Sequence, residues 1–199
     1  MLCINSLEDK KISIVELYEH ILTPGINSIV EDFPDDDDLI WKEHVRSGII
    51  RTIIESAYPF VLKERDKRGK INGEKVIVMC PRFEDHELGA RMVSDFFTIA
   101  GYESVFIGAN TPEKTIIKAV EEIKPKYISM SVTNYYNLIS TKKTIDIIKE
   151  NFKYGIKFLL GGQAFASNPE VYKEIGGDLL LKSFDDILGL KEAGGREWN

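Results

Sequence analysis

The sequence places a histidine, His86, in a short polar stretch between an apolar run and an amphipathic segment. Glu84 precedes it by two residues and Gly89 follows it by three. An imidazole can ligate a metal through one ring nitrogen, while a nearby carboxylate fixes the tautomer through the other. Glu84 is our first choice for that carboxylate and Asp85 is the alternative. Gly89 would leave room for a bulky group. Alone, this spacing also suits a solvated loop histidine.

The residues around His86 predict the elements that position it. Residues 75–80 form an apolar run typical of a buried strand, and residues 88–100 repeat apolar side chains at helical spacing. The alternation recurs to the end of the chain, with strands expected at 76–80, 104–107, 127–132, 157–160 and 178–181, and helices at 88–100, 112–123, 136–152, 168–175 and 184–193. Five such units predict an α/β fold with a doubly wound parallel sheet. Ligands of such sheets bind outside the carboxyl ends of the strands, where His86 lies.

Three further loops should share that edge of the sheet. Residues 108–112 follow the second strand, Ser131 and Thr133 end the third, and residues 161–165 (Gly-Gly-Gln-Ala-Phe) end the fourth. Alternation puts the two hydroxyls on one side of their strand, and the glycines remove side chains nearby. Together these loops predict a deep, narrow, mildly polar pocket beside His86. Backbone bonding at a strand end remains the alternative for the hydroxyls, as a simple turn does for the glycines.

The first part of the chain, residues 1–70, predicts a small helical domain before an α/β domain at residues 74–199. A helix over 12–22 should kink or break at Pro24, and a long helix over 39–62 should bend or split near Pro59. The charged residues 64–73, which end in glycine, are typical of a linker.

Composition excludes several classes of protein. The 199 residues are 43% hydrophobic and 29% charged, as in ordinary globular proteins. The net charge of −6 and the pI near 5.2 argue against direct nucleic-acid binding. We expect no membrane span and a cytoplasmic location, because no signal peptide or long apolar run occurs. Neither a GxGxxG nor a GxxxxGK[ST] loop is present, which disfavours dinucleotide and nucleoside-triphosphate sites.

Three motifs, Glu84-x-His86-x-x-Gly89, Ser131-x-Thr133 and Gly161-Gly162, resemble the cobalamin-binding domain family in order and spacing. The resemblance covers residues 75 to about 190 and implies a flavodoxin-like (Rossmann-like) five-stranded sheet. It implies cobalamin bound base-off, with His86 as the lower axial cobalt ligand and the freed nucleotide tail in a slot between the loops. The cofactor-binding residues would be Glu84, Asp85, His86, Leu88, Gly89, Ser131, Thr133, Gly161, Gly162, Gln163 and Phe165.

The details are most similar to the sensor-type branch of that family, which includes light-responsive cobalamin regulators. Methyl carriers usually have aspartate where this chain has Glu84. Sensors also carry a helical cap in which a tryptophan precedes a Glu-His pair near the upper axial ligand. Here Phe33 stands in place of that tryptophan before Glu43 and His44, so the resemblance assigns these three residues to the upper face. An ordinary pair on a helix surface is the alternative for Glu43 and His44.

We therefore expect a cobalamin-binding sensory or regulatory protein, without catalytic activity of its own, that acts through a protein partner. The alternative is a corrinoid subunit that carries methyl groups between methyltransferases. A third reading is a degenerate relative that binds haem or nothing. The oligomeric state stays open, a homo-oligomer included.

Overall fold

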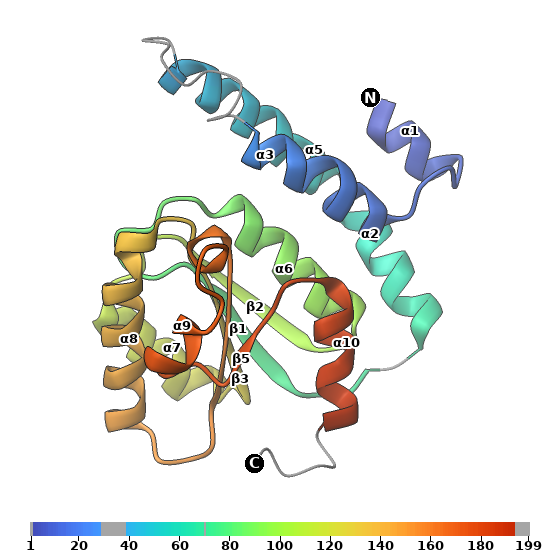
Figure 1. Ribbon diagram of the computed structural model, residues 1–199. Coiled ribbons are helices and arrows are strands. Elements are labelled where there is room, and N and C mark those ends of the chain that lie inside the picture. Colours follow the sequence, from blue (N-terminus) through green and yellow to red (C-terminus); the bar gives the residue numbers. More distant parts are fainter. Residues whose placement is uncertain (1, 29–38, 70, 194–199) are drawn as a thin grey trace. The chain divides into compact units, whose positions relative to one another are not determined.

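The computed structural model describes residues 2–28, 39–69 and 71–193, which fall into two compact units, residues 1–68 and 69–199. Figure 1 shows the helices of the first unit in blue and cyan, and the sheet and helices of the second in green to red. No helix in these ranges combines the length and apolarity needed to cross a bilayer.

The first unit is helical. It contains α1 (Leu2–Glu8), α2 (Ile14–Glu16), the π-helix η1 (Leu17–Leu22), α3 (Thr23–Asn27) and α5 (Leu39–Arg68). Ser13 caps α2 in a reciprocal capping box with Glu16. The long helix α5 contacts α1, α2 and α3. Its buried residues recur at helical spacing: Ile50, Ile54, Ala57 and Val61.

The chain stays helical through both prolines, so the break at Pro24 and the split near Pro59 are wrong. Pro24 lies in the first turn of α3, where a missing N–H is tolerated, and η1 runs directly into that turn. Pro59 lies inside the continuous helix α5 on an exposed face, where water can bind the carbonyl that proline leaves unpaired. The helix also extends to Arg68, into the expected linker, where Glu64 pairs with Lys67 and Arg68.

The second unit is an α/β sandwich, as predicted. Its five strands are β1 (Lys75–Met79), β2 (Glu103–Gly108), β3 (Tyr127–Ser131), β4 (Lys157–Gly161) and β5 (Leu179–Leu180). All pairs are parallel, in the order β2-β1-β3-β4-β5. The helices are α6 (Leu88–Ile99), α7 (Glu113–Ile123), α8 (Leu138–Asn151), α9 (Val171–Glu174) and α10 (Phe184–Ala193), with short 3-10 turns η2 (Tyr135–Asn137) and η3 (Gln163–Phe165).

Alternation along the strands divides the core between the two faces of the sheet. One set of buried side chains packs with α7, α8 and α9: Ile77, Met79, Ile128, Met130, Phe158 and Leu160. The opposite face lies toward α6 and α10 (Figure 1), which contact each other.

The strand order changes direction between β1 and β3. After β1 the chain crosses to β2 on one side, and β3 then lies on the other side of β1. The helices that follow β1 and β3 therefore lie on opposite faces of the sheet, and the ends of these two strands mark the switch point at which open α/β sheets bind ligands. Residues 80–87 and 132–137 are the loops that follow β1 and β3.

Candidate functional site

A buried carboxylate, Glu84, joins the loops that follow β1 and β3. Its Oε1 lies 2.5 Å from Nδ1 of His86 and accepts the backbone N–H of His86 at 3.2 Å. Its Oε2 accepts the backbone N–H groups of Thr133 at 2.9 Å and Asn134 at 3.0 Å, and Nδ2 of Asn137 at 2.9 Å. One carboxylate thus ties the loop after β1 to the loop after β3.

The surroundings of Glu84 stabilise its ionised form. Burial by itself would raise the pKa of this carboxyl, but the hydrogen bonds from His86, Asn134, Asn137 and Thr133 outweigh burial and hold the pKa at about 2. The group is therefore a carboxylate throughout the neutral range.

The imidazole of His86 lies at the protein surface, next to the buried carboxylate of Glu84. Its side chain is 61% exposed, whereas that of Glu84 is 1% exposed. A carboxylate beside Nδ1 requires the ring proton there, so a neutral His86 carries its lone pair on Nε2. An oriented imidazole of this kind, made more basic by a carboxylate behind it, is the common form of a histidine metal ligand. The structure pairs His86 with Glu84 and leaves Asp85 exposed.

Two asparagines that the sequence patterns did not predict belong to this site. Asn137 bonds both Glu84 and, through the same Nδ2, the carbonyl of Phe83 at 3.2 Å. Asn110 accepts the backbone N–H of Phe83 at 2.9 Å through Oδ1. No sequence signal marks either residue, because their partners lie 53 and 27 positions away in the chain.

The glycines of the motifs differ in what they accommodate. A methyl group on Gly162, whose φ is +107°, would lie 2.3 Å from the carbonyl oxygen of Val132, and one on Gly161 would lie 2.9 Å from that of Leu181. Close packing of the chain on itself thus explains both glycines. A methyl group on Gly89 would make only an ordinary 3.7 Å contact with Oγ of Ser131. Nothing in the described chain demands glycine at position 89, so the space above Ser131 suits a ligand.

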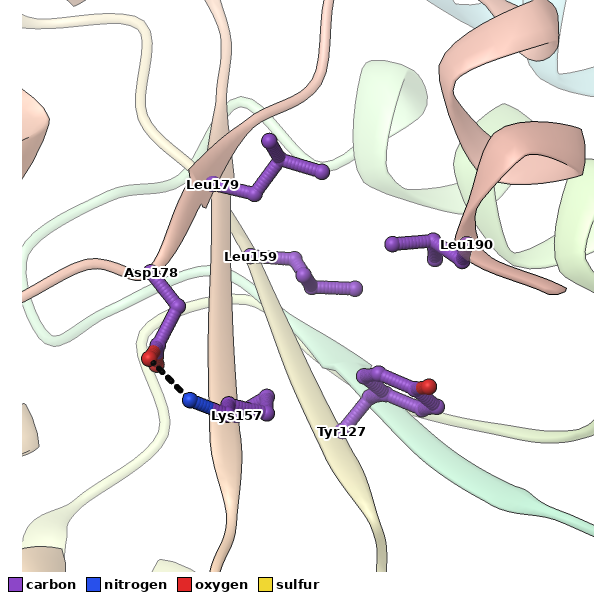
Figure 2. A pocket seen from close by; sticks show the side chains of 6 residues that line it. All are labelled: Tyr127, Lys157, Leu159, Asp178, Leu179 and Leu190. Carbon is purple, nitrogen blue, oxygen red and sulfur yellow. Dashed lines mark hydrogen bonds and ion pairs between the residues drawn. The ribbon is translucent and has the colours of Figure 1, made fainter. Parts of the chain in front are cut away.

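A column of paired residues leads from this site down the α6/α10 face of the sheet. The register pairs Ser131 with Gly161, Ser129 with Leu159 and Tyr127 with Lys157. At its lower end is a mostly apolar crevice lined by Tyr127, Lys157, Leu159, Asp178, Leu179 and Leu190. Figure 2 shows the leucine side chains pointing into a common space, with the Lys157–Asp178 pair at 2.9 Å beside it. Ser131 and Ser129 thus precede the crevice along this face of β3.

The other predicted site residues of the second unit do not contact His86 through their side chains in any hydrogen bond described above. Thr133 contributes its backbone N–H to Glu84, and Gln163 is exposed at the start of η3. Leu88 and Phe165 are buried, at 7% and 2% exposure, and Phe165 belongs to the core on the α7/α8 face.

The residues assigned to the upper face belong to the first unit. In α5, His44 Nε2 lies 3.5 Å from Glu43 Oε2, and Oε1 of Glu43 accepts the hydroxyl of Ser47 at 2.5 Å. His44 is well exposed, so the pair has the form of an ordinary surface contact within this unit. Phe33 lies outside the described residues.

Comparisons with known proteins find corrinoid proteins among those similar in sequence or in fold. The trimethylamine corrinoid protein 1 of Methanosarcina acetivorans is 24% identical over 177 residues, which are 87% of this chain and 79% of that protein. The monomethylamine corrinoid protein of Methanosarcina barkeri has the same fold, with a TM-score of 0.79 at 15% identity over 96% of this chain and 87% of its own. The methanol:cobalamin methyltransferase complex of the same organism contains a chain with a TM-score of 0.55 at 17% identity, over 90% of this chain and 67% of that one.

The family model settles the class of cofactor. Residues 74–187, more than half of the chain, match the model of the B12 binding domain. The matched range contains the Glu84–His86 pair, Gly89, Ser131 and the column below it. The chain therefore belongs to the B12-binding domain family, and cobalamin is its cofactor.

Proposed function

We propose that this chain is the corrinoid subunit of a multi-component methyltransferase, in which it carries methyl groups on cobalamin held through His86. The observation that carries the ligand assignment is the 2.5 Å contact between Glu84 Oε1 and His86 Nδ1. The names of its relatives support the methyl-carrier role, since those reported above are a trimethylamine corrinoid protein, a monomethylamine corrinoid protein and a chain of a methyltransferase complex. They favour this role over the sensory one that the sequence placed first.

Different residues of the site would hold different parts of the cofactor. Glu84 keeps the ring proton on Nδ1 of His86, so that Nε2 can ligate cobalt. The open space at Gly89 beside Ser131, followed by Ser129 and the crevice near Tyr127, would receive the nucleotide tail. Bound cobalamin would supply a metal centre that accepts and releases a methyl group. The exposure of the His86 side chain leaves room for the cofactor to approach Nε2.

Uptake of cobalamin at neutral pH tests this proposal. The purified protein is mixed separately with hydroxo-, methyl- and adenosylcobalamin, desalted, and examined by visible spectroscopy. We expect retention of the hydroxo and methyl forms with a histidine-ligated spectrum. His86→Ala should lose that spectrum, whereas the control His20→Ala, a change in the first unit, should keep it.

Two results would contradict the proposal. An unchanged spectrum in His86→Ala would remove the ligand assignment. Selective retention of adenosylcobalamin, with a light-dependent change of oligomer size, would replace the methyl carrier with a sensor.

A further inference from the structure

Phe83 has a backbone conformation that few residues other than glycine adopt. Its φ is +70°, a region that is sterically costly for a bulky side chain. Hydrogen bonds hold it there from both sides, since Asn110 accepts its N–H and Asn137 donates to its carbonyl. A strained residue held on both sides is a reason to look for a use of its side chain.

Packing within the second unit does not explain why an aromatic side chain is present there. Phe83 is 64% exposed. The guanidinium of Arg82 lies over its ring, 4.8 Å from the centroid. Arg82 also forms an ion pair with Glu113 at 3.5 Å. A glycine at position 83 would relieve the strain and forfeit little buried area.

A second group of exposed aromatic side chains lies on the neighbouring loop. Tyr135 is 57% exposed and Tyr136 is 81% exposed, both in η2. The loops of Phe83 and η2 lie side by side, because Glu84 and the Phe83 carbonyl are both bonded to residues 133–137. Asn134 fixes the start of η2 by accepting the N–H of Tyr136 at 3.0 Å.

We infer that Phe83, Tyr135 and Tyr136 form an aromatic seat for the corrin macrocycle of cobalamin. This inference rests on the proposed ligation of cobalt by His86. The macrocycle is broad and rimmed with methyl groups, and a metal held by His86 brings it over a loop whose exposed aromatic residue is three positions away. Contact with the ligand would then bury the ring that the strained backbone of Phe83 presents.

The hydrogen-bond frame favours the cofactor over a protein partner as the occupant of this seat. Asn137 bonds the carbonyl of Phe83 and the carboxylate that orients His86 with one and the same amide nitrogen. The aromatic ring and the metal ligand are therefore held by one set of contacts, as expected if they bind one molecule. A surface for another protein would not need this coupling.

Three variants test the aromatic seat. Phe83→Gly removes the ring and the strain, and Phe83→Leu keeps an apolar side chain together with the strain. Lys124→Gly is the matched control, since Lys124 also has a positive φ, of 52°, but ends α7 at the opposite edge of the sheet. Thermal unfolding is measured on the apoprotein, and the dissociation constant of hydroxocobalamin is measured by equilibrium dialysis.

We expect Phe83→Gly to unfold at the same or a higher temperature than wild type, while its dissociation constant rises about tenfold or more, as for the loss of a buried aromatic side chain. Phe83→Leu should bind nearly as well as wild type. Lys124→Gly should unfold at the same or a higher temperature with unchanged binding. The bound cofactor should keep its histidine-ligated spectrum in Phe83→Gly, because the frame around His86 stays intact.

The outcomes separate this inference from the proposed function. If Phe83→Gly binds like wild type while His86→Ala loses the ligated spectrum, the seat is wrong and the function stands. If the apoprotein of Phe83→Gly unfolds at a lower temperature and its histidine-ligated spectrum is lost, Phe83 stabilises the folded protein instead, and the inference of an aromatic seat is wrong. If wild type retains no cobalamin, both the function and the seat are wrong.

Discussion

Glu84 and His86 are in contact at 2.5 Å, yet one side chain is almost fully buried and the other is mostly exposed. The carboxylate is held by donors from two loops, so its position depends on the fold. The imidazole has this carboxylate on one side and is mostly exposed on the other. The fold therefore fixes the position of Glu84, and Glu84 in turn fixes the orientation of the His86 ring and of its Nε2.

Replacing the Glu84 carboxylate should change how folding depends on pH. Its folded-state pKa of about 2 is lower than the 4.5 of an ordinary glutamate. The stabilisation is therefore complete above pH 4.5 and is lost as the pH falls toward 2. Glu84→Gln should cost about 3 kcal/mol in unfolding free energy at neutral pH and flatten this dependence. Urea unfolding of the apoprotein between pH 2.5 and 7 measures both.

The control for this variant is Glu122→Gln, an exposed position on α7. It should stay within about 0.5 kcal/mol of wild type. A Glu84→Gln protein with the pH dependence of wild type would show that the buried carboxylate contributes nothing to this behaviour.

Removing the amide of Asn137 should weaken the frame that joins the two loops. Asn137→Ala deletes a hydrogen bond to a buried carboxylate and the one to the Phe83 carbonyl, so the apoprotein should lose about 2 kcal/mol of unfolding free energy. Asn151→Ala, at the exposed end of the helix α8 that follows Asn137, should lose less than about 0.5 kcal/mol. Equal losses in the two variants, measured by chemical unfolding, would argue against a special role for Asn137.

Alanine at two motif glycines should have opposite effects. Gly162→Ala forces a methyl group onto the Val132 carbonyl at a strained φ, and should cost at least about 3 kcal/mol. Gly89→Ala lies at the start of α6 without a clash, so the apoprotein should be as stable as wild type or more stable, by up to about 1 kcal/mol. Its cobalamin uptake should nevertheless fall, because the methyl group fills ligand space. Unimpaired uptake by a folded Gly89→Ala protein would remove position 89 from the binding site.

Acid should detach His86 from bound cobalt. Only a neutral imidazole can ligate a metal, so protonation competes with ligation as the pH falls. The visible spectrum of the loaded protein should shift to a form without the histidine ligand while far-UV circular dichroism shows the chain still folded. His86→Ala should show no such acid-linked shift. If the spectrum of the loaded wild-type protein stayed the same from neutral to acid pH, the histidine would be ruled out as the ligand.

The sequence by itself determined the α/β domain and the edge where its site lies. Apolar runs of strand length, followed by segments with helical periodicity, predicted all five strands to within about two residues at their ends. The same order placed Glu84, His86, Ser131 and the double glycine at the carboxyl ends of parallel strands. These are local patterns, and local patterns are what a single sequence displays.

Only the tertiary structure decided which groups meet. It selected Glu84 over Asp85 as the partner of His86, added Asn110 and Asn137, and showed that Gly161 and Gly162 serve close backbone packing. It also carried two helices through prolines that local rules treat as breaks. The physical reason is that most of these features depend on contacts between loops about 20 to 50 residues apart in the chain, and on which helix faces meet water. Such contacts exist only once the sheet order β2-β1-β3-β4-β5 has brought the segments together.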